Sequence, residues 1–260
     1  MRAASLICLL VLPAAPAAAQ TPLAVPPPAQ GTFLTRAAFN FGYAVLESGD
    51  PRFGTIAHFG ADLDLIDYAT GRLTFVAAWE GVLGSERRPF DLNHTNYVLE
   101  SAFTRRIKHG EVAAVFHHVS RHLSDRENPA TIAWNVLLVR ATRTFAAGAS
   151  SLDAQIEVGR TLQHTFVDYR WTSDLRLALH RPISGRVTVY GTAAGGLIGI
   201  DRAISDRERL CGARFEGGVH FDGQVSGVDL YVGYERRIDA YPLDRHRERW
   251  FEVGFRVGTR

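Results

Sequence analysis

Long segments in which apolar and polar residues alternate occupy most of this chain. Successive side chains of a β-strand point to opposite faces, so such a segment forms a strand with one apolar and one polar face. A strand of a soluble protein runs about 5–6 residues, whereas a tilted membrane-spanning strand needs about 9–11. The segments 151–163, 168–181 and 249–258 are of the longer kind. In the first of these, Leu152, Ala154, Ile156 and Val158 alternate with Asp153, Gln155, Glu157 and Gly159.

The pattern predicts twelve strands, an even number as expected of bacterial membrane barrels formed by one chain. They are 33–46, 53–67, 72–83, 92–107, 111–122, 131–145, 151–163, 168–181, 186–199, 211–222, 225–238 and 249–258. Most connections after even-numbered strands are short, and most of those after odd-numbered strands are longer and charged. Short periplasmic turns alternating with longer outer loops are typical of outer-membrane barrels. We therefore predict an all-β fold, a single transmembrane antiparallel up-and-down β-barrel over residues 32–260, with both ends of the chain in the periplasm. The alternative is a soluble periplasmic β-protein, whose apolar faces would meet in a sandwich core.

The N-terminal segment predicts export from the cytoplasm. Residues 1–19 combine an early Arg2, an apolar run and Ala17-Ala18-Ala19, as in a cleaved signal peptide. Residues 20–31 are rich in Pro and Ala and are expected to form an extended tail. The expected location is the outer membrane, and the expected partners are outer-membrane lipid or lipopolysaccharide and the machinery that inserts barrels. The net charge of +2 comes from interspersed charges without a basic block, so no nucleic-acid partner is predicted. No cofactor is predicted.

The polar faces of these strands are expected to line the barrel interior. Charges of both signs in a narrow lumen would pair, because an isolated buried charge is costly. A mostly plugged lumen is therefore expected in place of a wide pore. The predicted lumen residues are Asp62, Asp64, Arg72, Glu80, Glu100, Arg106, Asp153, Glu157, Arg170, Asp174, Arg176, Glu216, Asp229, Glu235, Glu252 and Arg256.

One strand places three groups capable of proton transfer on a single face. His118, Ser120 and His122 stand at alternate positions near the outward end of the segment 111–122. Ester hydrolysis needs a serine nucleophile, a histidine base and a group that orients the base. In this row Ser120 is the candidate nucleophile, His118 the base and His122 a second base.

The group that orients the base is not settled by spacing. Asp125, Glu127 and Glu100 are the candidates. Metal binding by His117, His118 and His122 is a further alternative, although His117 belongs to the opposite face. No metal site is assigned. The alternation also does not settle whether the row faces the lumen or the lipid.

Several short segments resemble an uncharacterised family of bacterial outer-membrane proteins. They are Gly49-Asp50-Pro51-Arg52, Phe90-Asp91-Leu92, Asn96-Tyr97 and His118-Val119-Ser120-Arg121-His122-Leu123-Ser124-Asp125. That family carries an H-x-S-S-H-L-G-D motif, from which this chain departs at Arg121 and Ser124. The resemblance covers roughly residues 48–143 and implies a barrel more than any activity.

A weaker resemblance is to the barrel lipid A deacylases, which carry an H-x-S pair followed by N-P-G and a catalytic Glu. His118-x-Ser120 and Asn128-Pro129 match, whereas Ala130 and Thr131 stand where Gly and Glu would be. This resemblance implies Ser120 as nucleophile and His118 as base, and Asp125 or Glu127 would have to replace the missing Glu.

The sequence thus favours an outer-membrane barrel with a structural, ligand-binding or small-solute transport function. The alternative is an ester hydrolase that acts on outer-leaflet lipid through His118 and Ser120. The orientation of the row separates the two, because a hydrolase needs it on the lipid-facing side or in a cleft at the rim.

Overall fold

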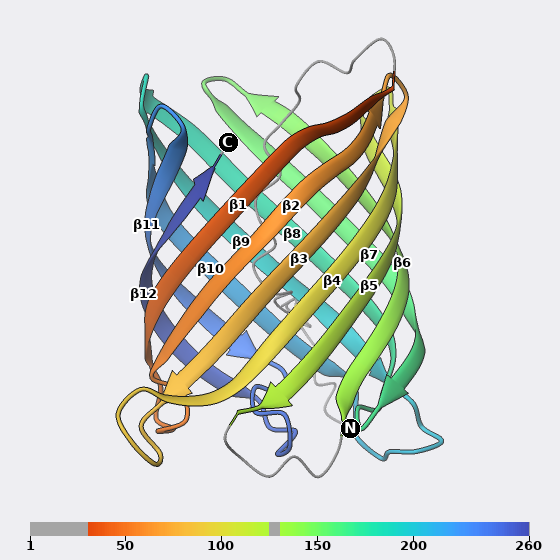
Figure 1. Cartoon of the computed structure of the whole chain (residues 1–260), viewed down its shortest axis with the longest axis vertical. Coiled ribbons are helices and arrows are strands. Elements are labelled where there is room, and N and C mark those ends of the chain that lie inside the picture. Colours follow the sequence, from red (N-terminus) through yellow and green to blue (C-terminus); the bar gives the residue numbers. More distant parts are fainter. Residues whose placement is uncertain (1–30, 125–130, 260) are drawn as a thin grey trace, which may run out of the picture.

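The computed structural model describes residues 31–124 and 131–259, which form twelve β-strands (Figure 1). No helix long and apolar enough to cross a membrane occurs within these residues. The strands are β1 (Thr32–Glu47), β2 (Thr55–Tyr68), β3 (Gly71–Gly84), β4 (Asp91–Ile107), β5 (Gly110–Leu123), β6 (Ile132–Ala147), β7 (Ser150–Thr165), β8 (Tyr169–Ser184), β9 (Val187–Ile200), β10 (Leu210–Asp222), β11 (Ser226–Arg237) and β12 (Glu248–Thr259).

Each strand pairs antiparallel with its neighbours in sequence, and β12 closes on β1. The register of this closing pair places Tyr43 opposite Phe255 and Val45 opposite Val253. Closure removes the free sheet edge along residues 40–45, so the backbone polar groups there are paired on both sides within the wall. The predicted up-and-down barrel is confirmed, and the predicted strand limits differ from the observed ones by three residues at most.

The two ends of the barrel differ in the length of their connections. At one end the strands are joined by short turns at 69–70, 108–109, 148–149, 185–186 and 223–225. The opposite end carries the connections 48–54, 85–90, 124–131, 166–168, 201–209 and 238–247. Figure 1 shows the C-terminus among the short turns and the longer loops at the other end. The longer loops mark the outer end of an outer-membrane barrel, as predicted.

Alternation along the strands separates a lipid-facing surface from the lumen. In β12, Phe251 and Val253 are 61% and 63% exposed, whereas the intervening Trp250 and Glu252 are 1% and 2% exposed. The exposed apolar side chains form the outer surface, where lipid replaces water as the solvent. The buried charged side chains face inward.

The inward-facing charged side chains form ion pairs in the lumen. Arg140 bridges Glu100 and Glu157, with N···O distances of 2.7 and 2.5 Å. Arg237 bridges Glu80 and Glu235 in the same way, at 2.6 and 2.7 Å. Such pairing compensates the cost of removing each charge from water.

The predicted mixture of lumen charges is observed, with one exception. Arg170 is exposed because the register between β8 and β9 shifts between Tyr169 and Trp171. The extra residue of this irregularity takes Arg170 out of the alternation that the sequence suggested.

Three loops at the outer end of the barrel contact one another. Val167 in the β7–β8 loop and Ile238 in the β11–β12 loop pack with Tyr169 in an apolar cluster. The cluster also contains Ile132, Ile200 and Leu210. Arg207, from the β9–β10 loop, forms ion pairs with Asp168 and Asp239. The loops after β7, β9 and β11 are thereby tied to one another across the mouth.

Loops that are tied together at the outer end, above a lumen of paired charges, predict that the barrel does not conduct ions. The protein reconstituted in planar bilayers is expected to give no stable single-channel steps. A porin inserted under the same conditions is the control. Reproducible steps from the purified protein would contradict a plugged lumen and would favour small-solute transport.

Candidate functional site

The row on β5 faces the lipid. Ser120 and His122 share their side of the strand with Phe116, which is 45% exposed. The other side of β5 carries Val115 and Val119, which are 0% and 6% exposed. The row lies near the loop end of the strand, on the outward surface of the barrel.

Asn135 on β6 orients one of the two histidines. It lies opposite His118 in the register of the two strands, and the Nδ1–H of His118 donates to Asn135 Oδ1 at 2.7 Å. A neutral imidazole that donates through Nδ1 leaves Nε2 free to accept a proton. Asn135 Nδ2 in turn donates to Gln163 Oε1 on β7, at 3.4 Å. Because this second bond uses the amide nitrogen, it favours the amide orientation that presents Oδ1 to His118.

Ser120 lies between the two imidazoles of the row. Its hydroxyl is 2.9 Å from His122 Nε2, within hydrogen-bond distance. The His122 ring packs edge-on against Tyr97, with centroids 5.2 Å apart, and Tyr97 is the register partner of Ser120 on β4. His118 stands two residues away on the other side, at about 6.6 Å along the strand. A rotation about the Cα–Cβ bond of Ser120 therefore directs the hydroxyl toward one imidazole or the other.

Arg121 holds this part of the strand from inside the barrel. Its side chain points inward between the outward-facing Ser120 and His122, and its Nη1 donates to the backbone oxygen of Asp239 at 2.5 Å. Its guanidinium also lies 5.4 Å from the centroid of the Trp134 ring. The β11–β12 loop and β6 thereby fix the outer end of β5.

The other candidates from the sequence do not join this cluster. Glu100 lies in the lumen, where it binds His117 at 3.2 Å and Arg140, so the prediction that it could orient His118 is wrong. Its position on the inward face of β4 is the reason. Asp125 and Glu127 lie outside the described residues. Within the described part of the chain, no group of three or more His, Cys, Asp or Glu side chains is arranged to hold a metal ion.

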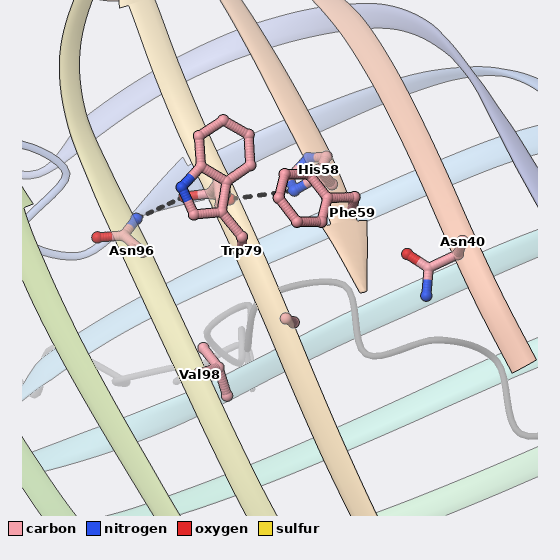
Figure 2. A pocket seen from close by; sticks show the side chains of 8 residues that line it. Asn40, His58, Phe59, Trp79, Asn96 and Val98 are labelled. Carbon is pink, nitrogen blue, oxygen red and sulfur yellow. Dashed lines mark hydrogen bonds and ion pairs between the residues drawn. The ribbon is translucent and has the colours of Figure 1, made fainter. Parts of the chain in front are cut away.

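A small pocket lies in the wall between β1 and β4 (Figure 2). Phe59 and Trp79 stack on its outer side with centroids 4.8 Å apart. On its inner side Glu80 accepts from Asn96 Nδ2 at 2.6 Å and lies 3.6 Å from His58. These polar groups already bind one another, and the lining contains no serine or cysteine nucleophile. Its lining residues are Asn40, His58, Phe59, Ala78, Trp79, Glu80, Asn96 and Val98.

Comparison with solved structures identifies the class of protein. The fold is similar to outer membrane phospholipase A from Escherichia coli, with a TM-score of 0.54 and 12% identity over 86% of this chain and 92% of that one. It is also similar to LpxR from Salmonella typhimurium, with a TM-score of 0.51 and 7% identity over 85% and 99% of the two chains. An outer membrane channel from Pseudomonas putida F1 gives a TM-score of 0.55 and 11% identity over 91% and 99%. The chain is an outer-membrane β-barrel protein.

Neither a family model nor a curated protein matches the sequence. The similarity to solved barrels is one of fold, shared by enzymes and channels. The activity must therefore be inferred from the residues of the site.

Proposed function

We propose that this protein is an ester hydrolase that acts on acyl lipids of the outer leaflet. The observation that carries the proposal is the lipid-facing Ser120 beside His118, whose imidazole is oriented by the 2.7 Å bond to Asn135. A serine, a histidine and an amide or carboxylate acceptor are the three parts of a nucleophilic hydrolase. A structural role alone does not require a polar triplet on a surface that meets lipid.

Each residue has a distinct role in the reaction. Ser120 Oγ attacks the ester carbonyl carbon while His118 Nε2 accepts the hydroxyl proton. Collapse of the tetrahedral intermediate breaks the bond to the alcohol, which leaves with the proton from His118. Water then attacks the acyl-enzyme through the same base, and the fatty acid is released. Asn135 Oδ1 holds the Nδ1–H tautomer of His118 throughout and stabilises the imidazolium when it forms.

The position of the site supports a membrane lipid as the substrate class. An outward-facing serine near the loop end of β5 meets lipid molecules of the outer leaflet and no solute in the lumen. Candidate substrates are therefore glycerophospholipids that reach the outer leaflet and the acyl chains of lipopolysaccharide. One of the similar barrels is a phospholipase by its name, which supports the same chemistry.

The test replaces Ser120 by alanine. Purified wild-type protein in mixed micelles is expected to release fatty acid from phosphatidylethanolamine or lipid A, and Ser120→Ala is expected to reduce the rate at least about 10³-fold. Mass spectrometry of the lipid products identifies the ester that is cut. Ser101→Ala is the matched control, because Ser101 is an exposed serine on the outward face of β4, the strand beside β5.

Two outcomes would contradict the proposal. One is fatty-acid release that continues unchanged in Ser120→Ala, which would assign the activity to another group or to a contaminant. The other is the absence of release from either lipid by folded wild-type protein. The barrel would then be a structural or ligand-binding element of the outer membrane.

A further inference from the structure

Two arginines face each other across a strand pair at the outer end of the barrel. Arg236 on β11 and Arg249 on β12 are register partners. Their chain neighbours Glu235 and Trp250 point into the barrel and are each 1% exposed. Arg236 and Arg249 therefore project from the outward face. The site is on the β11–β12 pair, apart from the residues on β5 and β6 described above.

This pair is unfavourable unless an anion joins it. Residues directly opposite on one face of an antiparallel pair have Cβ atoms about 4.5–5.5 Å apart, and like charges there repel. The adjacent inward-facing Arg237 has carboxylates of Glu80 and Glu235 within 2.7 Å. In contrast, neither Arg236 nor Arg249 takes part in an ion pair among residues 31–124 and 131–259. An anion from outside the chain would supply the negative charge that this pair lacks.

The outward residues that follow the arginines toward the membrane centre match the successive parts of a lipid molecule, from headgroup to acyl chains. The outward pair next in register is Tyr234 and Phe251, whose ring centroids are 5.2 Å apart. Below it, Val232 pairs with Val253 and Leu230 with Phe255. The outward surface of this strand pair thus passes from charged to aromatic to aliphatic toward the membrane centre. Aromatic side chains prefer the membrane interface, and aliphatic ones prefer the hydrocarbon region.

The length of this column corresponds to one leaflet. Arg236 lies six positions after Leu230, which is about 20 Å along the strand. At a strand tilt of about 40°, this is about 15 Å along the membrane normal, half of a hydrocarbon core of about 30 Å. A lipid with its headgroup at the arginines would extend its acyl chains over the valines and Leu230.

We propose that Arg236 and Arg249 bind the phosphate of an outer-leaflet lipid whose acyl chains lie along this column. A guanidinium binds phosphate through two parallel hydrogen bonds, so two guanidiniums can hold one phosphate from both sides. Their combined charge matches a phosphomonoester, which carries about −1.5 to −2 at pH 7, better than a phosphodiester with a single charge. The occupant is therefore a lipid phosphomonoester, the chemistry of phosphorylated lipid A. This site does not depend on the proposed hydrolase activity.

The test measures lipid binding by native mass spectrometry of the purified full-length protein in detergent. The probes are bisphosphorylated lipid A, dephosphorylated lipid A and phosphatidylglycerol, which is a phosphodiester. The variant is the double substitution Arg236→Gln with Arg249→Gln. Arg186→Gln is the matched control, because it removes an exposed arginine at the opposite, short-turn end of the barrel.

Bisphosphorylated lipid A is expected to bind the double variant about tenfold or more weakly than the wild type. Arg186→Gln is expected to change binding less than twofold. Dephosphorylated lipid A should not distinguish the wild type from the double variant, and phosphatidylglycerol should bind the wild type more weakly than lipid A does. Equal binding of lipid A to the wild type and the double variant would overturn the proposal. Wild-type binding of phosphatidylglycerol as strong as that of lipid A would overturn the assignment to a phosphomonoester.

A stability measurement gives an independent readout. In lipid-free detergent the double variant is expected to unfold at the same or a higher urea concentration than the wild type, because a repulsive pair has been removed. Added lipid A should then stabilise the wild type and not the variant. A double variant that is less stable than the wild type without lipid would show that the arginines bind within the protein, which would also overturn the proposal.

Discussion

Substitution of His118 by alanine is expected to reduce ester hydrolysis about 10³-fold or more, whereas His122→Ala is expected to reduce it tenfold at most. The two histidines stand two residues on either side of Ser120 on the same outward face of β5. They differ in what orients them. His118 has its Nδ1 bound to Asn135 at 2.7 Å, which leaves Nε2 as the basic nitrogen. His122 contacts the hydroxyl at 2.9 Å and packs against Tyr97.

Each histidine variant is therefore the matched control for the other. The measurement is kcat for fatty-acid release, with folding confirmed by the gel-mobility shift of heated and unheated samples. Asn135→Leu is expected to lower kcat by about 10²-fold without a comparable change in KM, because it removes the acceptor that fixes the His118 tautomer. A large loss in His122→Ala with little loss in His118→Ala would reverse the assignment. The base would then be the histidine that binds the serine in the resting structure.

Arg214→Leu is expected to lower the free energy of unfolding by about 3–5 kcal/mol. The Arg214 guanidinium lies 2.6 Å from Glu252, 3.2 Å from Glu216 and 3.7 Å from Glu235. All three carboxylates are nearly inaccessible to solvent. Glu235 and Glu216 keep ion pairs with Arg237 and Arg256, so removal of Arg214 takes the arginine mainly from Glu252. The loss follows from leaving the buried carboxylate of Glu252 uncompensated, which costs more than the ion pair itself contributes.

Urea unfolding in detergent, followed by tryptophan fluorescence, measures this effect. Arg214→Lys is the matched control, since it keeps a positive charge near the carboxylates and is expected to cost less than the leucine variant. If the leucine variant is as stable as the wild type, the carboxylates find other partners and the network does not hold the lumen together. Ester hydrolysis by the leucine variant below its unfolding transition should change little, because Arg214 on β10 is remote from β5.

The barrel could be predicted from the sequence because alternation reports directly on a sheet with one lipid-facing and one polar face. The limits of β5 differ by only one residue at each end from the predicted 111–122. Arg170 shows where this reasoning fails. A single irregularity in the pairing of β8 changes the face on which a side chain lies, and alternation carries no signal for it.

The candidate site could be predicted only in part. His118 and Ser120 are two apart on one strand, so local geometry brings them together. Asn135 is brought to His118 by the register between β5 and β6, which depends on pairing along both strands and across a loop. Its only sequence signal is an amide at a position of β6 between the outward Ala133 and Leu137. Glu100 was a better candidate by charge, but it lies on the opposite face of the wall.

The outward position of Ser120 has a consequence for how an enzyme of this kind would be controlled. Its substrate arrives by lateral diffusion in the plane of the membrane, so the relevant concentration is the mole fraction of that lipid in the outer leaflet, a surface density. No gate in the barrel has to open, and both products depart sideways into the bilayer. For a glycerophospholipid substrate, the rate would then report on the asymmetry of the membrane. It would stay low while the two leaflets keep their separate lipids and rise when substrate lipid crosses to the outer side.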